Sequence, residues 1–356
     1  MPRVCLAVLL LCLSGPLWAL SPAPLDRDEL RLSLAPYMGY YEDRGGKLDA
    51  EAVQRLPDEA FAQVRGDHAN LGKNASVWWF KVRMVNGRPR PLSGYLEVNY
   101  ALLDHIDVYL QDEDGHLQRQ YSGDSFAFAQ RPVQVRHFWF PMTLSHGSNT
   151  LLLRVESTST IFVPLFFSTY GASAAAQENL MGINGAFYGV LFAMFIYNLF
   201  LFISLRERAY FWYLVYNVNV GLFAACFDGM LFKLLPNSVG LQSVSIYVLM
   251  YLHCLSAAQF SRHFLHIPQH FPRLDKGLRL LMLGIVGCLL SVPLIGLAAW
   301  NILASVAVLL VSLILLLTGI YAWRRGVRHG SYYVLAWSVL LVTSMKATSS
   351  TLQAST

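Results

Sequence analysis

The residues of this chain that are best suited to chemistry are aromatic and charged side chains in its first half. Trp78 and Trp79 are adjacent, and adjacent side chains of a β-strand point to opposite faces of the sheet. Only one of the two can therefore belong to the core of a β-sandwich. The other could form an aromatic platform that stacks on a sugar ring or a partner, or it could lie at an edge that a neighbouring loop covers.

Two charged residues give a second candidate site. Asp124 and Arg131 flank the segment Phe126-Ala127-Phe128. They could form an ion pair that braces a loop, or they could be part of the rim of a ligand site. The candidate ligand-binding residues are Trp78, Trp79, Asp124, Arg131 and Trp139.

Other kinds of chemistry have less support in the sequence. Asp112, Glu113 and Asp114 could contact a divalent cation, because hard oxygen ligands suit calcium, or they could form the solvated tip of a hairpin. The sequence contains no nucleophile elbow, no His-Glu-x-x-His motif and no phosphate-binding loop. We therefore expect no enzymatic activity, no cofactor and no metal site.

The candidate residues lie on short alternating segments that predict β-strands. Turn signals separate these segments, and Asp114-Gly115 between two alternating runs is a good hairpin signal. Several short strands with almost no helical periodicity predict an antiparallel β-sandwich or jelly roll. The stretch 49–65 could be one short helix or a loop. The predicted strands are Val77–Val85, Leu92–Val98, His105–Gln111, His116–Tyr121, Val135–Leu144 and Thr150–Glu156.

The composition of the chain changes sharply near residue 178. Residues 20–178 carry 15 Lys and Arg against 19 Asp and Glu, a net charge of −4 (15 − 19), and long apolar segments begin at Leu180. With 55% hydrophobic and 14% charged residues overall, the chain is too apolar for an ordinary soluble protein. Its net charge of +5 arises beside the apolar segments and not on a basic face of the first half, so we expect no nucleic-acid partner.

The N-terminus predicts export of the domain that follows it. Arg3 precedes an apolar run from Val4 to Leu13, and Ala19 supplies a small residue beyond it, which is the pattern of a cleaved secretory signal. None of the five cysteines lies between residues 20 and 178, so this half has no disulfide framework. We predict a signal peptide at 1–19, an exported sensor domain at 20–178, a helical bundle at 179–345 and a polar tail at 346–356.

Five segments of the second half are long enough to span a lipid bilayer. The connections between them alternate in charge, because three hold nine Lys and Arg in total and the other two hold only Lys233. The positive-inside rule then places the N-terminal domain outside the cytoplasm, in agreement with the export signal. The predicted spans are about Gly182–Ile203, Tyr210–Leu231, Val239–Phe260, Leu278–Leu297 and Ile302–Trp323, with a partial sixth from Tyr332.

Two features of the predicted spans stand apart. His253 is an intramembrane polar candidate, because an ionisable residue within a span is a functional candidate by default. The alternative is a neutral imidazole bonded to a neighbouring helix. The sixth segment, Tyr332–Met345, supplies only 14 residues before the polar tail, which predicts a truncated or frameshifted end.

Several motifs resemble those of the bacterial seven-transmembrane receptors with diverse intracellular signalling modules. Phe187–Arg206 is similar to the first span of that family, and Phe260–Leu265 is similar to the exit of its third span. The first half resembles the type-2 extracellular domain of the family, and Trp78, Trp79, Asp124 and Arg131 occupy matching motif positions. The motifs that follow the family order are Ser76–Val82, Gly123-Asp124, Gln130–Pro132, Phe140-Pro141 and Leu153–Ser157.

The resemblance implies a jelly-roll periplasmic sensor related to carbohydrate-binding modules, then seven helices in the bacterial inner membrane, then a cytoplasmic kinase, cyclase or phosphatase. Because this chain departs from the pattern at the sixth helix, we expect a signalling input and a membrane relay without an output module. The expected ligand is a carbohydrate or a small carboxylate. The alternatives are a non-signalling membrane-anchored binding protein or gene remnant that pairs with a full-length receptor, and a small-solute transporter. The expected protein partner is a second copy of the chain or a full-length receptor.

Overall fold

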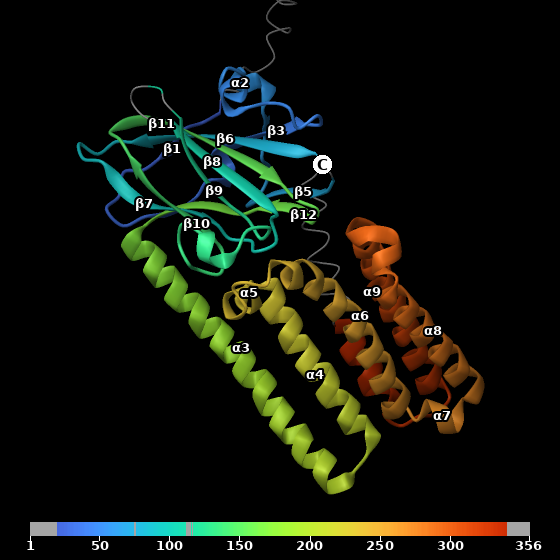
Figure 1. Ribbon diagram of the computed structural model, residues 1–356. Helices are drawn as coiled ribbons and strands as arrows, with labels where there is room; N and C mark the ends of the chain where they lie inside the picture. Colours follow the sequence, from blue (N-terminus) through green and yellow to red (C-terminus); the bar gives the residue numbers. More distant parts are fainter. Residues whose placement is uncertain (1–19, 75, 112–114, 116, 340–356) are drawn as a thin grey trace, which may run out of the picture.

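The computed structural model of the chain describes residues 20–74, 76–111, 115 and 117–339. A β-sandwich lies at one end of a set of long helices (Figure 1). Among the described residues, the larger sheet has seven strands in the order β4-β3-β6-β11-β8-β9, with β1 beside β6. These strands are β1 (Ala23–Pro24), β3 (Met38–Asp43), β4 (Ala62–Gln63), β6 (Val77–Asn86), β8 (His105–Gln111), β9 (Leu117–Ser122) and β11 (Gly147–Glu156).

A second sheet covers the inner face of the first. Its strand order is β10-β7-β13-β2, and a separate pair joins β12 to β5. Every pairing is antiparallel except that of β1 with β6, as the alternating segments predict. The remaining strands are β2 (Arg31–Ser33), β5 (Ala69–Lys73), β7 (Leu92–Val98), β10 (Phe138–Leu144), β12 (Thr160–Val163) and β13 (Leu165–Thr169).

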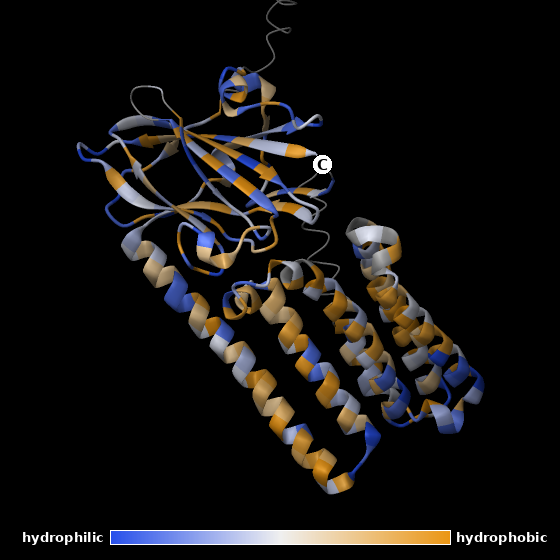
Figure 2. Cartoon of the chain, in the orientation of Figure 1, coloured by the Kyte–Doolittle hydropathy of each residue, from blue (hydrophilic) through white to orange (hydrophobic). Residues whose placement is uncertain are grey.

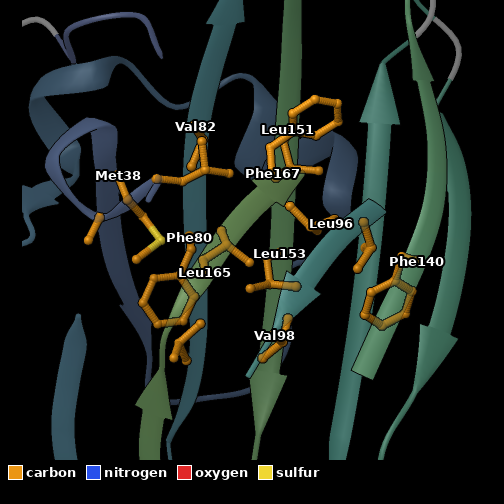
Figure 3. Close-up of a cluster of buried hydrophobic side chains, with 14 of the residues drawn as sticks. Met38, Phe80, Val82, Leu96, Val98, Phe140, Leu151, Leu153, Leu165 and Phe167 are labelled. Carbon is orange, nitrogen blue, oxygen red and sulfur yellow. The ribbon is translucent and has the colours of Figure 1, made fainter. Parts of the chain in front are cut away.

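The core of the sandwich lies between the two sheets. Phe80 and Val82 of β6 point into it, because alternate side chains of a strand lie on one face. Leu151 and Leu153 of β11 meet them there, and Phe140 and Phe167 come from the facing sheet (Figure 3). Burial of many large apolar side chains supplies the driving force for folding this half without disulfides.

A second, smaller core lies on the outer face of the larger sheet. Trp79 points to that face, and the short helix α2 (Ala50–Gln54) covers it together with Phe61. The Asp49 side chain caps α2 by accepting a hydrogen bond from the Ala52 N–H at 2.7 Å. The stretch 49–65 thus contains the short helix α2, the 3-10 turn η2 (Asp58–Ala60) and β4.

All six predicted strands are present, whereas β1, β2, β3, β4, β5, β12 and β13 were not predicted. The bounds of β7 and β8 are those predicted, and β6, β9 and β11 differ by one to three residues at their ends. β10 begins three residues late, at Phe138 and not at Val135. Residues 131–137 are not part of the strand, because Arg131, Arg136 and His137 contact the helical half. His116, at the predicted start of β9, lies outside the described residues.

The helical half begins at the last strand without a linker. The helix α3 follows β13 directly, and its 36 residues extend about 54 Å, more than the roughly 30 Å core of a bilayer. Ser173 in its first turn donates a hydrogen bond to Glu97 of β7 at 3.0 Å. The helices are α3 (Tyr170–Leu205), α4 (Arg208–Phe227), α5 (Met230–Leu234), α6 (Val239–Phe264), α7 (Ile267–His270), α8 (Pro272–Leu290) and α9 (Val292–Arg324).

Four described helices are long and apolar enough to cross a membrane, namely Tyr170–Leu205, Arg208–Phe227, Val239–Phe264 and Ala299–Arg324. Hydrophobic residues run along them, and hydrophilic residues gather after α3 and between α6 and α8 (Figure 2). The predicted span Leu278–Leu297 corresponds to α8, which ends at Leu290 and is not among the four. Its first turns carry Arg273, Asp275, Lys276 and Arg279.

Two breaks interrupt the predicted spans. The second predicted span, Tyr210–Leu231, is divided at Asp228 and Gly229 into α4 and α5. Gly296, with a φ of 75°, kinks α9. Residues 330–339 are helical, and the Tyr333 hydroxyl lies 2.7 Å from Ser261 Oγ of α6, so the start of the predicted sixth segment packs in the bundle.

Candidate functional site at the junction of sandwich and helices

The sandwich contacts the helices through the segment between β9 and β10. The Phe128 N–H donates to the Pro236 carbonyl at 3.2 Å, and the Phe128 ring meets Phe232 of α5 edge-on at 5.9 Å. Tyr100 of the sandwich likewise meets Phe227 at the end of α4. The segment 126–138 and the end of α4 with α5 therefore form one interface, which we call the junction.

An ion-pair cluster around Asp228 connects three elements at the junction. The Arg136 guanidinium, only 6% exposed, pairs with the Asp228 carboxylate. Asn184 of α3 donates to the same carboxylate oxygen at 2.9 Å, and His137 Nε2 lies 3.7 Å from the other oxygen. One side chain at the end of α4 is thus held by the sandwich and by a second helix.

The backbone at Gly229 allows this close approach. Its φ of 74° lies in the left-handed region, which glycine adopts without steric cost. A Cβ at this position would lie 2.8 Å from the Arg136 carbonyl oxygen and 2.8 Å from the Ala101 Cβ. The helix therefore breaks where the sandwich backbone reaches it, and a side chain at position 229 would push the two apart.

Arg131 occupies an aromatic cage at the junction. Its guanidinium carbon lies 4.8 Å from the centre of the Phe128 ring, 4.5 Å from that of Phe138 and 4.9 Å from that of Phe232. Its Nη1 donates to the carbonyls of Val135 at 2.9 Å and Arg136 at 2.8 Å. Burial lowers the pKa of Arg131 to about 10, although Asp124 partly opposes this shift. Its contacts with aromatic faces contribute cation–π stabilisation.

Asp124 is buried beside a second carboxyl group. Its side chain lies within hydrogen-bonding reach of Asp104, and its own N–H donates to the Leu103 carbonyl at 2.8 Å. Burial raises the pKa of Asp124 well above its usual range, the nearby Asp104 raises it further, and Arg131 lowers it only in part. Among the ion pairs of the described residues, none joins Asp124 to Arg131 directly. The two residues interact electrostatically but do not form the ion pair that was one of the two alternatives for them.

The raised pKa of Asp124 makes the stability of the chain depend on pH. The folded state holds this proton above pH 4, where an unfolded aspartate releases it, because the usual pKa is about 3.9. Stability is therefore fully present below that value and falls as pH rises through the folded pKa. We expect Asp124→Asn, which keeps a neutral donor toward Asp104, to raise the melting temperature at pH 8 and to leave it unchanged near pH 4. Thermal unfolding of both proteins from pH 4 to 8 measures this, and parallel curves would contradict it.

Comparison with known proteins agrees with this architecture. A family model described as 7TMR-DISM extracellular 2 matches residues 35–169, which end with β13. A second model, 7TM diverse intracellular signalling, matches residues 180–354. The chain belongs to this receptor family. The junction thus joins the region of one family model to that of the other, and these regions are membrane-receptor input domains.

Further comparisons add little. No curated protein is significantly similar to the chain. Among solved structures, a Bacillus thuringiensis Cry1Da tryptic core variant matches with 13% identity and a TM-score of 0.23. The match covers 42% of the receptor chain and 24% of that structure, so the chain spans about a quarter of its length.

The three candidate tryptophans of the receptor are buried. Trp78 packs in the main core and donates to Asn74 Oδ1 at 2.7 Å. Trp79 is 0% exposed and stacks on Tyr109, with ring centres 5.8 Å apart. Trp139 packs against Tyr95 at 5.2 Å. None of these indoles presents a free face to solvent, so in this structure they act as packing residues.

His253 and the acidic triplet complete the predicted candidates. The His253 ring packs beside Tyr216 of α4 at 4.9 Å, which places it between α4 and α6 and away from the junction. Asp112, Glu113 and Asp114 lie outside the described residues. Within the described part of the receptor, no group of three or more His, Cys, Asp or Glu residues could hold a metal ion.

Sequence reasoning missed the residues that form the centre of the junction. Arg136, Asn184, Asp228 and Gly229 were not among the candidates, although Asp228 and Gly229 lie within the predicted span Tyr210–Leu231. An acidic residue followed by glycine near the end of an apolar segment is the signal that could have identified them. Charged residues in a span are costly and are usually paired.

Proposed function

We propose that this chain is the input and membrane-relay portion of a bacterial envelope receptor, with the sandwich in the periplasm and the helices in the inner membrane. The observation that supports this most directly is the cluster around Asp228, where Arg136 of the sandwich and Asn184 of α3 bind one carboxylate. A change in the sandwich that moves Arg136 alters the packing of α3 against α4. The cluster is therefore suited to pass a change of state from sandwich to helices.

The distribution of charge supports this orientation. Arg206 follows α3, Arg208 begins α4, and Arg273 and Lys276 lie in the first turns of α8. These ends of α3, α4 and α8 lie far from the sandwich (Figure 1). Excess Lys and Arg in connections mark the cytoplasmic side. We expect a membrane-impermeant thiol reagent to label Tyr121→Cys once the outer membrane is permeable, and Arg325→Cys only after the inner membrane is opened. The reverse pattern would contradict the orientation.

The proposed input is a small molecule or carbohydrate that binds the sandwich. Membership of a family of sensory receptors supports this role. A ligand shifts a conformational equilibrium only as far as it binds the two arrangements with different affinity. The relay therefore requires a ligand that favours one packing of the junction over the other.

The test uses the full chain in lipid nanodiscs. A panel of glycans and short carboxylates is screened by thermal unfolding, because a ligand at 100 times its Kd stabilises the native state by about 2.7 kcal/mol. Hydrogen exchange of residues 126–138 and 227–236 is then compared with and without the hit. We expect Asp228→Asn to keep the thermal shift and to lose the change in exchange.

Two outcomes would count against the proposal. If no member of a broad panel raises the melting temperature, the sensor role is wrong. If a ligand raises it but leaves exchange at the junction unchanged in the natural chain, the protein binds without relaying, which is the function of a membrane-anchored binding protein.

A further inference from the structure

A groove runs along the surface of the bundle between α4, α6 and α8. Its volume is about 830 Å³, and its walls are mostly aliphatic. Val215, Val218 and Leu222 line it from α4, and Leu252 lines it from α6. Leu283 and Val286 of α8 close the third side. Several of these side chains are exposed in the structure, so the groove is an open apolar surface at the depth of the membrane spans.

The length of the groove fits an acyl chain. Leu249 and Arg262 of α6 mark its two ends, and the 13 residues between these positions rise about 20 Å along a helix. One leaflet contributes about half of the roughly 30 Å hydrocarbon core of a bilayer. The groove therefore reaches from the edge of one leaflet past the middle of the membrane.

One end of the groove is basic. Arg262 is buried, its Nε donating to Asp275 at 2.7 Å and its Nη1 to Gln259 at 2.6 Å. Arg279 lies 2.6 Å from the other oxygen of Asp275, and its side chain is 63% exposed. Two guanidinium groups thus share one carboxylate. One positive charge is therefore uncompensated at this end of the groove, which we call the mouth.

Lys276 adds to the charge at this end. Positions 276, 279, 283 and 286 follow the spacing of one helix face, and three of them, Arg279, Leu283 and Val286, line the groove. Lys276 is exposed and lies on the same face, one turn before Arg279. The mouth therefore combines three cations with one carboxylate, while the walls beyond it are apolar. An amphiphile with an anionic head and a hydrocarbon tail is complementary to both parts.

We propose that this groove binds an anionic phospholipid from the leaflet next to the basic connections, with its phosphate at Lys276 and Arg279 and one acyl chain between α4 and α6. A protein helix in the same place would leave the excess positive charge unpaired unless it brought an acid of its own. The lipid would fill the groove and fix the spacing of α4, α6 and α8. The proposal is independent of the ligand of the sandwich.

The test measures lipid retention by the full chain. The protein is reconstituted in nanodiscs with equal amounts of phosphatidylglycerol and phosphatidylcholine, extracted in mild detergent and weighed by native mass spectrometry. We expect retained phosphatidylglycerol to exceed phosphatidylcholine, and each of Lys276→Gln and Arg279→Gln to lower this preference by about fivefold, the effect of one basic residue at a lipid surface. Arg324→Gln, an exposed cation outside the groove, is the matched control and should change nothing.

A second variant tests the walls separately from the charge. Val218→Trp places an indole in the groove and should abolish retention of both lipids, whereas Leu309→Trp, on an exposed face of α9 outside the groove, should not. Equal retention of the two lipids by the natural chain would overturn the proposal, and so would retention that Val218→Trp leaves unchanged. A photoreactive side chain at position 218 that cross-links to protein and not to lipid would show that a helix occupies the groove.

Discussion

Replacing Asp228 by alanine is expected to release the sandwich from the helices while both remain folded. The substitution leaves the Arg136 guanidinium, 6% exposed, without its carboxylate, and Arg136 Nε and Nη2 already have no hydrogen-bond partner among the described residues. Breaking a buried ion pair by removing one partner costs about 3 kcal/mol or more, because the remaining charge is buried and uncompensated. We expect this cost to be relieved by separation of the junction, which returns Arg136 to water.

Hydrogen exchange and a distance measurement would detect the separation. Amides of residues 126–138 should exchange at least tenfold faster in Asp228→Ala, since about 1.4 kcal/mol of lost protection gives a factor of ten. Spin labels at Tyr121→Cys and Leu234→Cys, both exposed positions, should show a broader distance distribution. Unchanged exchange and distances would mean that the ion pair does not hold the junction.

Two further variants isolate the cause. Asp28 pairs with Arg88 on the surface of the sandwich and is 86% exposed, so Asp28→Ala removes an ion pair of the kind that contributes little and should leave the junction intact. Replacing both Arg136 and Asp228 by methionine removes the pair together, which is often neutral for buried pairs. The amides of residues 126–138 should therefore exchange more slowly in the double variant than in Asp228→Ala.

Six of the thirteen described strands of the sandwich could be predicted, because their signals are local. Alternation in Leu92–Val98 and His105–Gln111 gives the bounds of β7 and β8 without error, since one face of each strand is buried against the facing sheet. The start of β10 could not be predicted in this way. Val135 is a strand-forming residue, but Arg136 pairs with Asp228, which lies 92 positions away in the sequence.

The spans could be predicted as apolar segments, but their breaks depend on tertiary contacts. The prediction from apolar length treated α4 and the start of α5 as one span, because Met230–Leu234 continues the hydrophobic pattern. The reason for the break at Gly229 is visible only in the folded structure, where a Cβ at this position would lie 2.8 Å from the Arg136 carbonyl oxygen. The same holds for α3, whose first turns look like part of the soluble domain but pack as a helix against β7.

The partners of the candidate residues could not be predicted, because some of them lie far away in the sequence. Asp124 and Arg131 were selected as a pair by proximity in sequence, and the structure places Arg131 in the junction and Asp124 just before it in the chain. Their partners are different ones, Asp104 for the first and three phenylalanine rings for the second. One of these rings, Phe232, comes from α5. Contacts between side chains of different domains leave no periodic pattern in the sequence. Residue types can therefore indicate which side chains need a partner, but not which residue that partner is.

The burial of Trp79 leads to the largest effect that we expect from a single substitution. The indole is 0% exposed and packs among Leu20, Val53, Phe61 and Leu152 beneath α2. Replacing a buried tryptophan by alanine removes its burial and leaves a cavity, which costs about 3–5 kcal/mol. We expect Trp79→Ala to lower the melting temperature of the full chain and to increase exchange of the amides of α2.

A comparison of variants separates packing from ligand binding at this position. Trp79→Phe retains most of the buried surface and should lose only part of the stability, whereas Tyr121→Ala, at a ring that is 48% exposed, should lose little. If Trp79 were instead a platform for a sugar, alanine would abolish binding and leave the melting temperature of the free protein unchanged. Because its neighbours cover the ring on the outer face of the sheet, we expect the loss of stability to come first, and any loss of binding to follow from displacement of α2.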